Sequence, residues 1–488
     1  MIKKRLKVKR KSSKARDRIK ILLDKDSFIE FHTFTSSRLV KSKKLINDAV
    51  VTGTGTIDGR KVYVYSQNFA EMGGSLGEMH AKKICYVYDL ALKTGCPVIS
   101  ILDSGGARIQ EGIYSLDGYG EIFARNVEAS GKILQLSIVA GACAGGAAYS
   151  PALTDFIFMI KEQSLMFVTG PKIIKTVTGE EITLQDLGGA MAHNAKSGVA
   201  HFAVANEDGC FSLIKQLFSY LPSNNLDDAP GFVSRDPIDR SCKELEKIVP
   251  IEESKVYDMK KVIECIFDEK SFLGLQRYYA RNAIIGFARM RGKTVGVVAN
   301  QPKVKAGCLD IKASCKIARF VQFCDSFSIP LVNLVDVPGY LPGKSEEHEG
   351  IIKHGAKILY AYSNAQVPKI ALILRKAYGG AYIALASKAL GYDSVIAWED
   401  AEIAVMGARQ AVELLNSKEI KKMSKKEVKE KVKRYKKKYL DIFKTAETDK
   451  IDLLIERKDS REAIARLLDN LSTKAYKPTN KRHGNIPL

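Results

Sequence analysis

Two glycine-rich turns carry the residues of this chain that could do chemistry. Gly145 and Gly146 end one run of small and apolar residues, and Gly379 and Gly380 end another run in the second half of the chain. Alanine, tyrosine and a helix-forming stretch follow each pair, so we expect N–H groups at a helix start to converge on one oxygen atom. Such groups stabilise an oxyanion without a titratable side chain. The repeat therefore predicts two equivalent sites for developing negative charge, as a reaction between two oxyanion-forming partners requires.

A single glycine pair is weak evidence, because glycine occurs wherever a backbone turns sharply. Here the turn recurs together with its surroundings. The segment Asp103-Ser-Gly-Gly106 precedes the first turn, and Asp336-Val-Pro-Gly339 precedes the second at nearly the same separation along the chain. The sequence shows neither a Ser-His-Asp arrangement nor a carboxylate pair beside either turn, which argues against hydrolysis. We therefore predict catalysis by paired oxyanion holes without a protein nucleophile.

The elements that must position these turns are short runs rich in Val and Ile and bounded by Gly, Pro or Asp. This pattern is typical of buried strands in α/β proteins, and helical periodicity is present over residues 317–327 and 350–362. Because both halves show the same alternation of short apolar runs and helical stretches, we predict two whole domains related by duplication rather than a solenoid. The proline-rich stretch 221–250 separates domains over residues 1–240 and 241–488. Strands are expected over residues 61–65, 97–102, 134–140, 156–160, 165–168, 294–299, 331–335, 370–374, 394–398 and 402–406.

The positive charge is concentrated in two segments. The chain has a net charge of +22, of which residues 1–18 and 418–438 carry +9 each. The rest is close to neutral, and no motif of interleaved aromatic and basic residues accompanies either run. We interpret both runs as solvated surface charge outside the motif-bearing blocks, the second on a helix, and we expect no nucleic-acid partner.

The cysteines and histidines suggest neither a disulfide framework nor a metal site. Nine cysteines are scattered singly and seven histidines are widely spaced, which favours reduced thiols in the cytoplasm and no bound metal. The glycines at 53, 55 and 59 miss the dinucleotide-binding fingerprint and predict a hairpin turn instead.

The longest uncharged stretch, Ile133 to Thr154, exceeds the length of a membrane span. Gly141, the first glycine pair and Ser150-Pro151 interrupt it. We therefore predict a strand, a turn and a helix start there, and a chain that does not span a membrane. The basic N-terminus lacks the apolar stretch of a secretory signal.

The turns belong to a longer series of motifs that resembles the carboxyltransferase (β) subunits of biotin-dependent acyl-CoA carboxylases, of the propionyl-CoA or acetyl-CoA type, and the related acyl-CoA decarboxylases. The resemblance extends from about residue 14 to about residue 470. It implies an α/β fold of two tandem crotonase-like domains of the ClpP/crotonase superfamily, often assembled as a hexamer in which the N-domain of one subunit faces the C-domain of another. The motifs are residues 51–60, 73–77, 103–112, 143–155, 197–202, 335–339, 375–382 and 401–407.

The resemblance also implies roles for individual residues. The enolate of the acyl-CoA thioester would accept hydrogen bonds from the amides of Gly145 and Gly146, and the ureido oxygen of biotin from those of Gly380 and Ala381. Carboxybiotin would release CO2, its anion would remove the α-proton, and the enolate would capture the CO2. Further substrate-binding residues are expected at Gly105, Gly106, Ala107, Arg108, Ala144, Tyr149, Gly379, Tyr382 and Ile383.

The chain lacks an Ala-Met-Lys-Met attachment site for biotin and a region the size of an ATP-grasp domain. By the resemblance, biotin is therefore carried on a separate chain. The implied partners are biotin carboxylase and biotin carboxyl carrier subunits, or a membrane decarboxylase subunit. Ile383 stands where propionyl-CoA carboxylases usually carry Asp, which favours acetyl-CoA, broad specificity or the decarboxylases.

Three alternatives stay open. The chain could serve a methylmalonyl-CoA-type decarboxylase, because the reaction at this subunit is reversible. A crotonase-type hydratase or isomerase would need a carboxylate beside the first turn and would not use the second. A nucleic-acid-binding protein would use the two basic runs.

Overall fold

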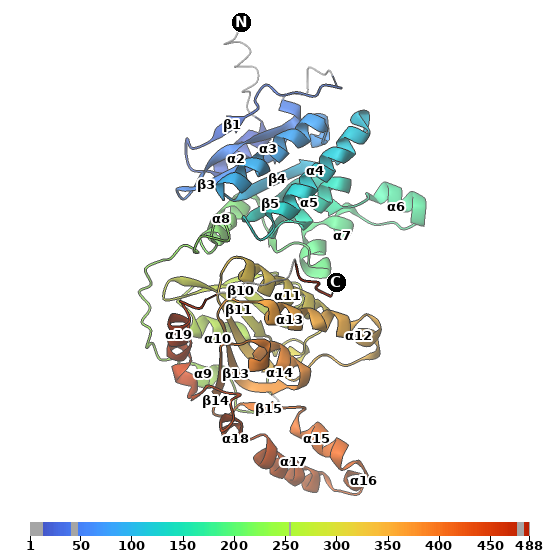
Figure 1. Ribbon diagram of the computed structural model, residues 1–488. Helices are drawn as coiled ribbons and strands as arrows, with labels where there is room; N and C mark the ends of the chain where they lie inside the picture. Colours follow the sequence, from blue (N-terminus) through green and yellow to red (C-terminus); the bar gives the residue numbers. More distant parts are fainter. Residues whose placement is uncertain (1–12, 41–46, 253–254, 476–482, 488) are drawn as a thin grey trace. The chain divides into compact units, whose positions relative to one another are not determined.

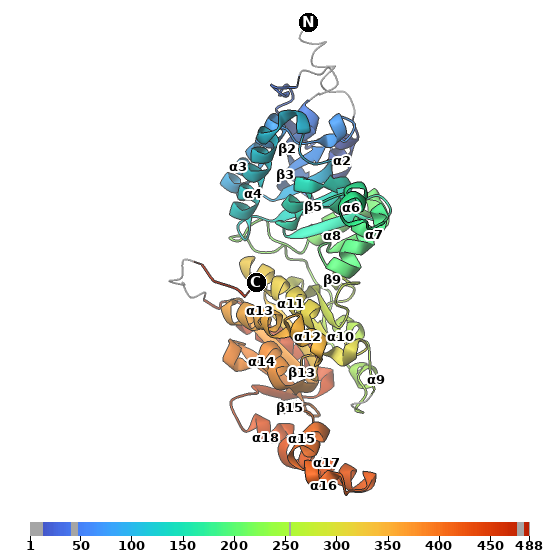
Figure 2. The ribbon, with the colours of Figure 1, turned by 90° about the vertical axis from the view of Figure 1, so that its right-hand side faces the viewer.

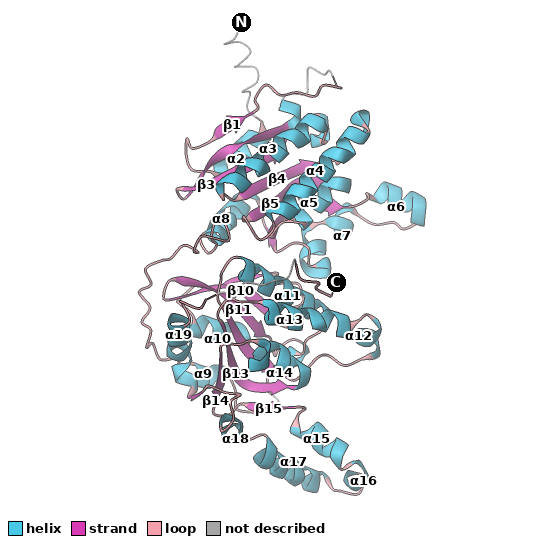
Figure 3. Ribbon diagram, in the orientation of Figure 1, coloured by secondary structure: helices cyan, strands magenta, loops and turns pink. Residues whose placement is uncertain are grey.

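The computed structural model describes residues 13–40, 47–252, 255–475 and 483–487. It divides into two compact units, Met1–Ala229 with Gln276–Tyr279, and Pro230–Leu275 with Ala280–Leu488. In each unit a mixed sheet lies between helices (Figures 1 and 3). The boundary at Ala229 lies within the proline-rich stretch 221–250.

The first unit has a sheet in the order β1-β2-β3-β4-β5-β6-β8, and β7 pairs with the end of β5. The pairs β1–β2 and β2–β3 are antiparallel, and the pairs from β3 to β8 are parallel. Asp58 and Gly59, at φ 49° and 75°, form the predicted hairpin turn between β2 and β3. The strands are β1 (Ile29–Phe31), β2 (Val50–Ile57), β3 (Arg60–Gln67), β4 (Val98–Ser104), β5 (Gln135–Ala144), β6 (Phe156–Ile160), β7 (Leu165–Phe167) and β8 (Phe202–Val204).

The second unit repeats this sheet strand for strand, in the order β9-β10-β11-β12-β13-β14-β16, with β15 paired to the end of β13. An irregularity in register falls at Asp103 between β4 and β5 and again at Asp336 between β12 and β13. The predicted duplicated α/β fold is therefore confirmed. The strands are β9 (Leu273–Leu275), β10 (Ala283–Met290), β11 (Lys293–Asn300), β12 (Leu331–Val337), β13 (Lys369–Tyr378), β14 (Ser394–Trp398), β15 (Glu402–Ala404) and β16 (Leu453–Ile455).

Helices cover both faces of each sheet because each helix buries one apolar stripe. In the first unit α3 (Glu78–Thr94) and α4 (Ile113–Ala129) lie on one face, and α2 (Lys14–Leu22) and α8 (Glu207–Phe218) on the other (Figure 2). In the second, α11 (Ile311–Ser326) and α13 (Ile351–Asn364) lie opposite α10 (Met259–Ile266) and α19 (Ser460–Asn470) (Figure 1). Shorter helices are α5 (Tyr149–Ala152), α6 (Pro171–Thr178), α7 (Leu184–Gly188), α9 (Leu245–Ile248), α12 (Lys344–His348), α14 (Gly379–Ala386), α15 (Ala408–Leu415), α16 (Ser417–Ile420) and α18 (Ile442–Ala446), and the longer α17 spans Lys425–Tyr439.

The duplication extends to a buried lysine in each unit. Lys83 on α3 donates through Nζ to the carbonyl oxygens of Asn47 (2.9 Å) and Val50. Lys316, at the equivalent place on α11, donates to the carbonyl oxygen of Ala283 at 2.8 Å. Burial lowers the pKa of each lysine to about 7. Each lysine thus ties a helix to the start of the second strand of its sheet, β2 or β10.

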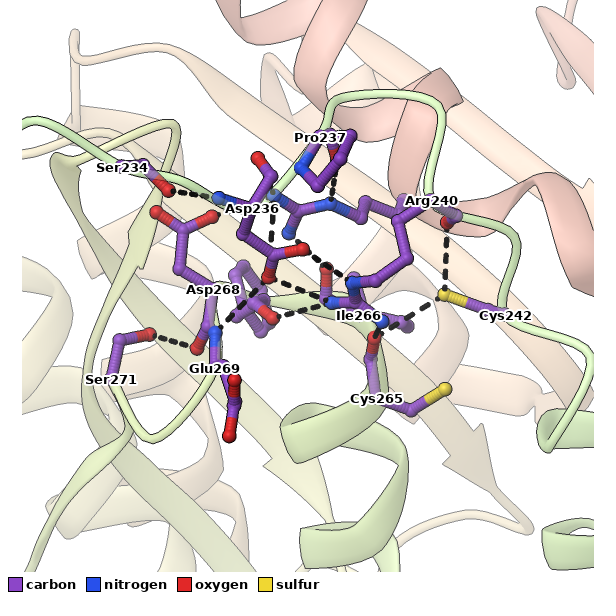
Figure 4. Close-up of polar contacts among 12 residues, drawn as sticks. Ser234, Asp236, Pro237, Arg240, Cys242, Cys265, Ile266, Asp268, Glu269 and Ser271 are labelled. Atoms are coloured by element: carbon purple, nitrogen blue, oxygen red, sulfur yellow. Dashed lines mark hydrogen bonds and ion pairs between the residues drawn. The ribbon is translucent and has the colours of Figure 1, made fainter.

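A buried ion cluster fixes the chain that leads into the second unit (Figure 4). The Arg461 side chain on α19 is fully buried, lies 2.7 Å from Oδ1 of Asp268, and donates through Nε to the Pro237 carbonyl at 2.8 Å. Arg240 donates through Nε to Asp236 at 2.6 Å. Burial opposes ionisation of Asp236, but the bond from Arg240 and the charges of both arginines outweigh it and hold the pKa of that carboxyl below its usual value.

We expect Arg461→Met to lower the free energy of unfolding of the second unit by about 3–5 kcal/mol, because it leaves a buried carboxylate without its partner. Arg466→Met is the matched control. Arg466 lies on the same helix in an exposed i,i+4 pair with Glu462, and its loss should cost less than about 1 kcal/mol. Urea denaturation measures both.

The loss should depend on pH. Because the pKa of Asp236 is lower in the folded chain, this carboxyl stabilises the fold at pH values above its pKa in the unfolded chain, about 3.9. That stability disappears as the pH falls through the lower folded value. The difference in the free energy of unfolding between Arg461→Met and the wild type should therefore become smaller at acid pH. Equal losses of stability for Arg461→Met and Arg466→Met at neutral pH would contradict the stabilising role of the buried ion cluster.

Candidate active site

The first glycine turn joins the end of β5 directly to a helical segment. β5 ends at Ala144, Gly145 adopts φ 62°, and a 3-10 turn over Gly145–Ala148 continues into α5. This φ costs roughly 1–2 kcal/mol for a residue with a side chain, which explains the glycine. The N–H groups at the start of such a segment have no acceptor within the helix. Helix starts of this kind are common binding sites for anionic oxygens.

The second turn repeats this geometry. β13 ends at Tyr378, Gly379 adopts φ 58°, and α14 begins at once. Gly379, Gly380 and Ala381 supply the first three N–H groups of α14. Gly145 therefore corresponds to Gly379, and Gly146 corresponds to Gly380.

The turns after β4 and β12 support the glycine turns from one side. A Cβ added to Gly106 would lie 2.8 Å from the Ala144 carbonyl oxygen, and one added to Gly380 would lie 3.6 Å from the Tyr340 ring. The N–H of Leu76 donates to the Gly106 carbonyl at 2.9 Å, and that of Leu309 donates to the Gly339 carbonyl at 3.0 Å. Each unit thus brings two consecutive strand ends together around one helix start.

Several groups expected to bind substrate are engaged within the protein. The N–H of Gly105 donates to the Gly73 carbonyl at 2.8 Å, and that of Gly106 to Oγ of Ser104 at 3.1 Å. The fully buried guanidinium of Arg108 pairs with Asp48 and, at 2.7 Å, with Glu111. Ala107 forms a parallel bridge with Leu76. These four residues shape the wall of the turn, and their contact with substrate stays a prediction.

The structure gathers the remaining predicted residues into two sets, one in each unit. Ala144, Gly145, Gly146 and Tyr149 surround the first turn, and residues 379–383 form the first turns of α14. Tyr149 and Ile383 hold equivalent positions and expose 50% and 46% of their surface. Each turn is thus followed, four residues after its first glycine, by one large exposed side chain.

Sequence reasoning missed the ion pairs that hold the ends of β4 and β12. Nη1 of Arg18 lies 2.8 Å from Oδ2 of Asp103, and Nη2 of Arg375 lies 2.8 Å from Oδ2 of Asp336. The Tyr257 hydroxyl donates to the same Asp336 oxygen at 2.9 Å. Because both carboxylates are buried in ion pairs, they fix the backbone beside the turns.

The interpretation of residues 1–18 as solvated charge is wrong for two arginines. Arg16 pairs with Glu30 at 2.7 Å, and Arg18 is buried against Asp103 and Glu207. Residues 1–12 of this run lie outside the described part of the chain. The partners lie far away in sequence, so a local charge count could not find them.

The second basic run is helical, as predicted, and forms α16 and most of α17. Lys436 lies outside the motif-bearing blocks in the sequence, but it contacts one of them in the folded chain. Nζ of Lys436 lies 2.9 Å from Oε1 of Glu402, within the motif 401–407, and Oε2 of Glu402 accepts a 2.6 Å bond from the Tyr378 hydroxyl. One lysine of this run is therefore linked through Glu402 to Tyr378, the residue before the second turn.

Within the described ranges, no cluster of three or more His, Cys, Asp or Glu is arranged to hold a metal ion. The helices of the same ranges include none with the length and apolar character that a membrane crossing needs. The nine cysteines, all of which are described, are free thiols.

The chain is similar to proteins of known activity along nearly all of its length. The family model of the carboxyl transferase domain matches residues 7–486. The methylmalonyl-CoA decarboxylase subunit alpha of Veillonella parvula is 52% identical over 478 residues, covering 97% of this chain and 93% of that protein. The mitochondrial propionyl-CoA carboxylase beta chain of Homo sapiens is 49% identical over 486 residues, covering 98% and 89%.

A solved structure agrees with these relatives. The crystal structure of transcarboxylase 12S, a hexamer with methylmalonyl-coenzyme A and methylmalonic acid bound, matches with a TM-score of 0.94 and 48% identity. The match covers 99% of this chain and 94% of that one.

The two glycine turns should respond differently to an added methyl group. A Cβ at Gly146 would lie 2.9 Å from the buried ring of Tyr119, whereas a Cβ at Gly380 makes an ordinary contact with Tyr340. We expect Gly146→Ala to lower the free energy of unfolding by about 1–3 kcal/mol through overpacking. Gly380→Ala should leave it unchanged or raise it by up to about 1 kcal/mol. Urea denaturation of both variants tests this, and equal losses would show that the environments of the turns do not differ.

Proposed function

The chain belongs to the carboxyl transferase domain family, and from that premise we propose that the first glycine turn of one subunit and the second glycine turn of another catalyse one carboxyl transfer from opposite sides. It is a carboxyltransferase of the propionyl-CoA carboxylase type. The reaction moves a carboxyl group between biotin and the α-carbon of a short-chain acyl-CoA. The observation that carries this proposal is the recurrence of a glycine helix start at the same strand end in both units, where the first N–H groups have no acceptor within the helix.

Each turn takes one oxyanion. The amides of Gly145 and Gly146 donate to the thioester oxygen as the acyl-CoA becomes an enolate. The amides of Gly380 and Ala381 donate to the ureido oxygen of biotin as that ring becomes an anion. Donors of this kind contribute about 3–4 kcal/mol each to the stability of the transition state, and they need no change of protonation.

Biotin supplies the carboxyl group as CO2 and, once decarboxylated, accepts the α-proton. The turns hold the two reacting oxygens during this exchange, and the buried ion pairs of Asp103 and Asp336 keep the strand ends in place. The N-terminal domain, residues 1–240, takes the acyl-CoA, and the C-terminal domain, residues 241–488, takes biotin. Both domains are of the crotonase-like type.

Biotin arrives on a separate carrier protein, which a biotin carboxylase subunit loads. The hexamer of transcarboxylase 12S supports a hexamer here, with the N-domain of one subunit facing the C-domain of another. The nine free thiols suit the cytoplasm. Because the Veillonella relative is a methylmalonyl-CoA decarboxylase subunit, a membrane decarboxylase partner is the second candidate, with the same chemistry run in reverse.

The paired turns can be tested by removing one donor. Ala381→Pro deletes the third N–H of α14, because proline has no backbone N–H. We expect kcat for transfer between acyl-CoA and biotin to fall by about 100-fold or more, with KM for acyl-CoA little changed. Circular dichroism and the melting temperature establish folding. A folded variant with activity within tenfold of the wild type would reject the second turn as an oxyanion hole.

Ile383 should influence the choice of acyl group. Its side chain is exposed on α14, four residues after Gly379. We expect Ile383→Asp to change the ratio of kcat/KM for propionyl-CoA over acetyl-CoA by roughly tenfold, as one methylene contact commonly does. Ile352→Asp, which changes an exposed isoleucine on α13, is the matched control. An unchanged ratio in a folded, active Ile383→Asp variant would place the specificity elsewhere.

A further inference from the structure

The second glycine turn has a polar anchor. Tyr378, the last residue of β13, comes directly before Gly379, and its hydroxyl donates a 2.6 Å hydrogen bond to Oε2 of Glu402. Glu402 begins β15, and its Oε1 accepts a 2.9 Å bond from Nζ of Lys436 on α17. A chain of two hydrogen bonds therefore joins the basic helix to the residue from which the second turn starts.

Comparison of the units indicates that the fold does not require this anchor. β7 pairs with the end of β5 in the same register as β15 with the end of β13. In that register Ala144 takes the place of Tyr378, and Leu165 takes the place of Glu402. The pairing that supports the turn forms in the first unit without these polar side chains. The chain of hydrogen bonds is thus an addition to the turn assigned to biotin.

The anchor restricts the backbone at the helix start. The Tyr378 ring is 5% exposed and lies against Gly407, where an added Cβ would stand 3.4 Å from Cε2 of the ring. Burial and the neighbouring Glu402 raise the pKa of Tyr378, so its hydroxyl stays a donor at neutral pH. Burial raises the pKa of Glu402, and the hydrogen bond from Tyr378 and the charge of Lys376 only partly oppose this shift.

We propose that Tyr378, Glu402 and Lys436 are positioning residues that hold the second turn against the ureido oxygen, so that the placement of α17 sets the rate of the biotin half of the reaction. This proposal rests on the function proposed above. A misplacement of about 1 Å in a catalytic geometry can cost about 100-fold in rate. Loss of any link should therefore lower kcat while the affinity for acyl-CoA stays the same.

The test uses the full chain in its native assembly. The first measurement is the transfer of the carboxyl group from methylmalonyl-CoA to free biotin, followed as propionyl-CoA formed. The second is the Kd for propionyl-CoA by calorimetry. The variants are Lys436→Met, Glu402→Gln and Tyr378→Phe, with Lys436→Arg as the conservative rescue. Lys437→Met is the matched control, because it removes the same charge from an exposed neighbouring position of α17.

We expect the three variants to lower kcat by about tenfold or more and to leave the Kd for propionyl-CoA within about twofold. Lys436→Arg should recover most of the rate, and Lys437→Met should match the wild type. Glu402→Gln and Tyr378→Phe preserve side-chain size, so they decide the question if Lys436→Met does not assemble. Rates equal to that of Lys437→Met, or equal losses in kcat and in affinity for propionyl-CoA, would overturn the positioning role. A wild-type chain that transfers no carboxyl group to biotin would instead reject the proposed function.

Discussion

The direct passage from a parallel strand into a helix, at Gly145 and at Gly379, is the constraint on which the rest of the structure depends. No side chain caps either helix start, so the first N–H groups have no acceptor in the helix or its cap. The passage also requires positive φ at the junction, which only glycine adopts without strain. Unpaired N–H groups beside a core are costly. The neighbouring strand ends must therefore hold the turn rigidly until a ligand oxygen supplies the missing acceptor.

The parts that provide this rigidity are the ones that both units share. Asp103 and Asp336 stand at the same irregularity in register and each pairs with a buried arginine. Lys83 and Lys316 tie equivalent helices to equivalent strands. Removing one member of a buried pair costs several kcal/mol, so such pairs resist change. Side chains that face the turns differ instead. The ring beside Gly146 comes from Tyr119 on α4, whereas the ring beside Gly380 comes from Tyr340 in the turn after β12.

The sequence predicted what depends on local residue types and missed what depends on distant partners. The strands expected over residues 156–160 and 394–398 coincide with β6 and β14, because apolar runs bounded by breakers are local signals. The turns were found because positive φ selects glycine. Arg18 and Lys436, in contrast, sit in runs of similar charges, and their acceptors lie 85 and 34 residues away. Only the folded chain distinguishes these two cations from their solvated neighbours. The two buried lysines did leave a usable signal, because Lys83 and Lys316 are separated by the same interval as the two repeated aspartates.

A site built from backbone amides also explains how one scaffold serves opposite reactions. In the proposed function the N–H groups stabilise an enolate oxygen and a ureido oxygen, and both anions occur whichever way the carboxyl group moves. Stabilising them lowers the barrier equally in both directions, since the forward and reverse reactions share one transition state. No side chain of the turns has to change its protonation state to reverse the roles. The relatives of this chain accordingly include both a carboxylase subunit and a decarboxylase subunit. In the proposed function the direction of transfer therefore comes from the proteins that load or unload biotin, because the backbone amides of this chain serve both directions alike.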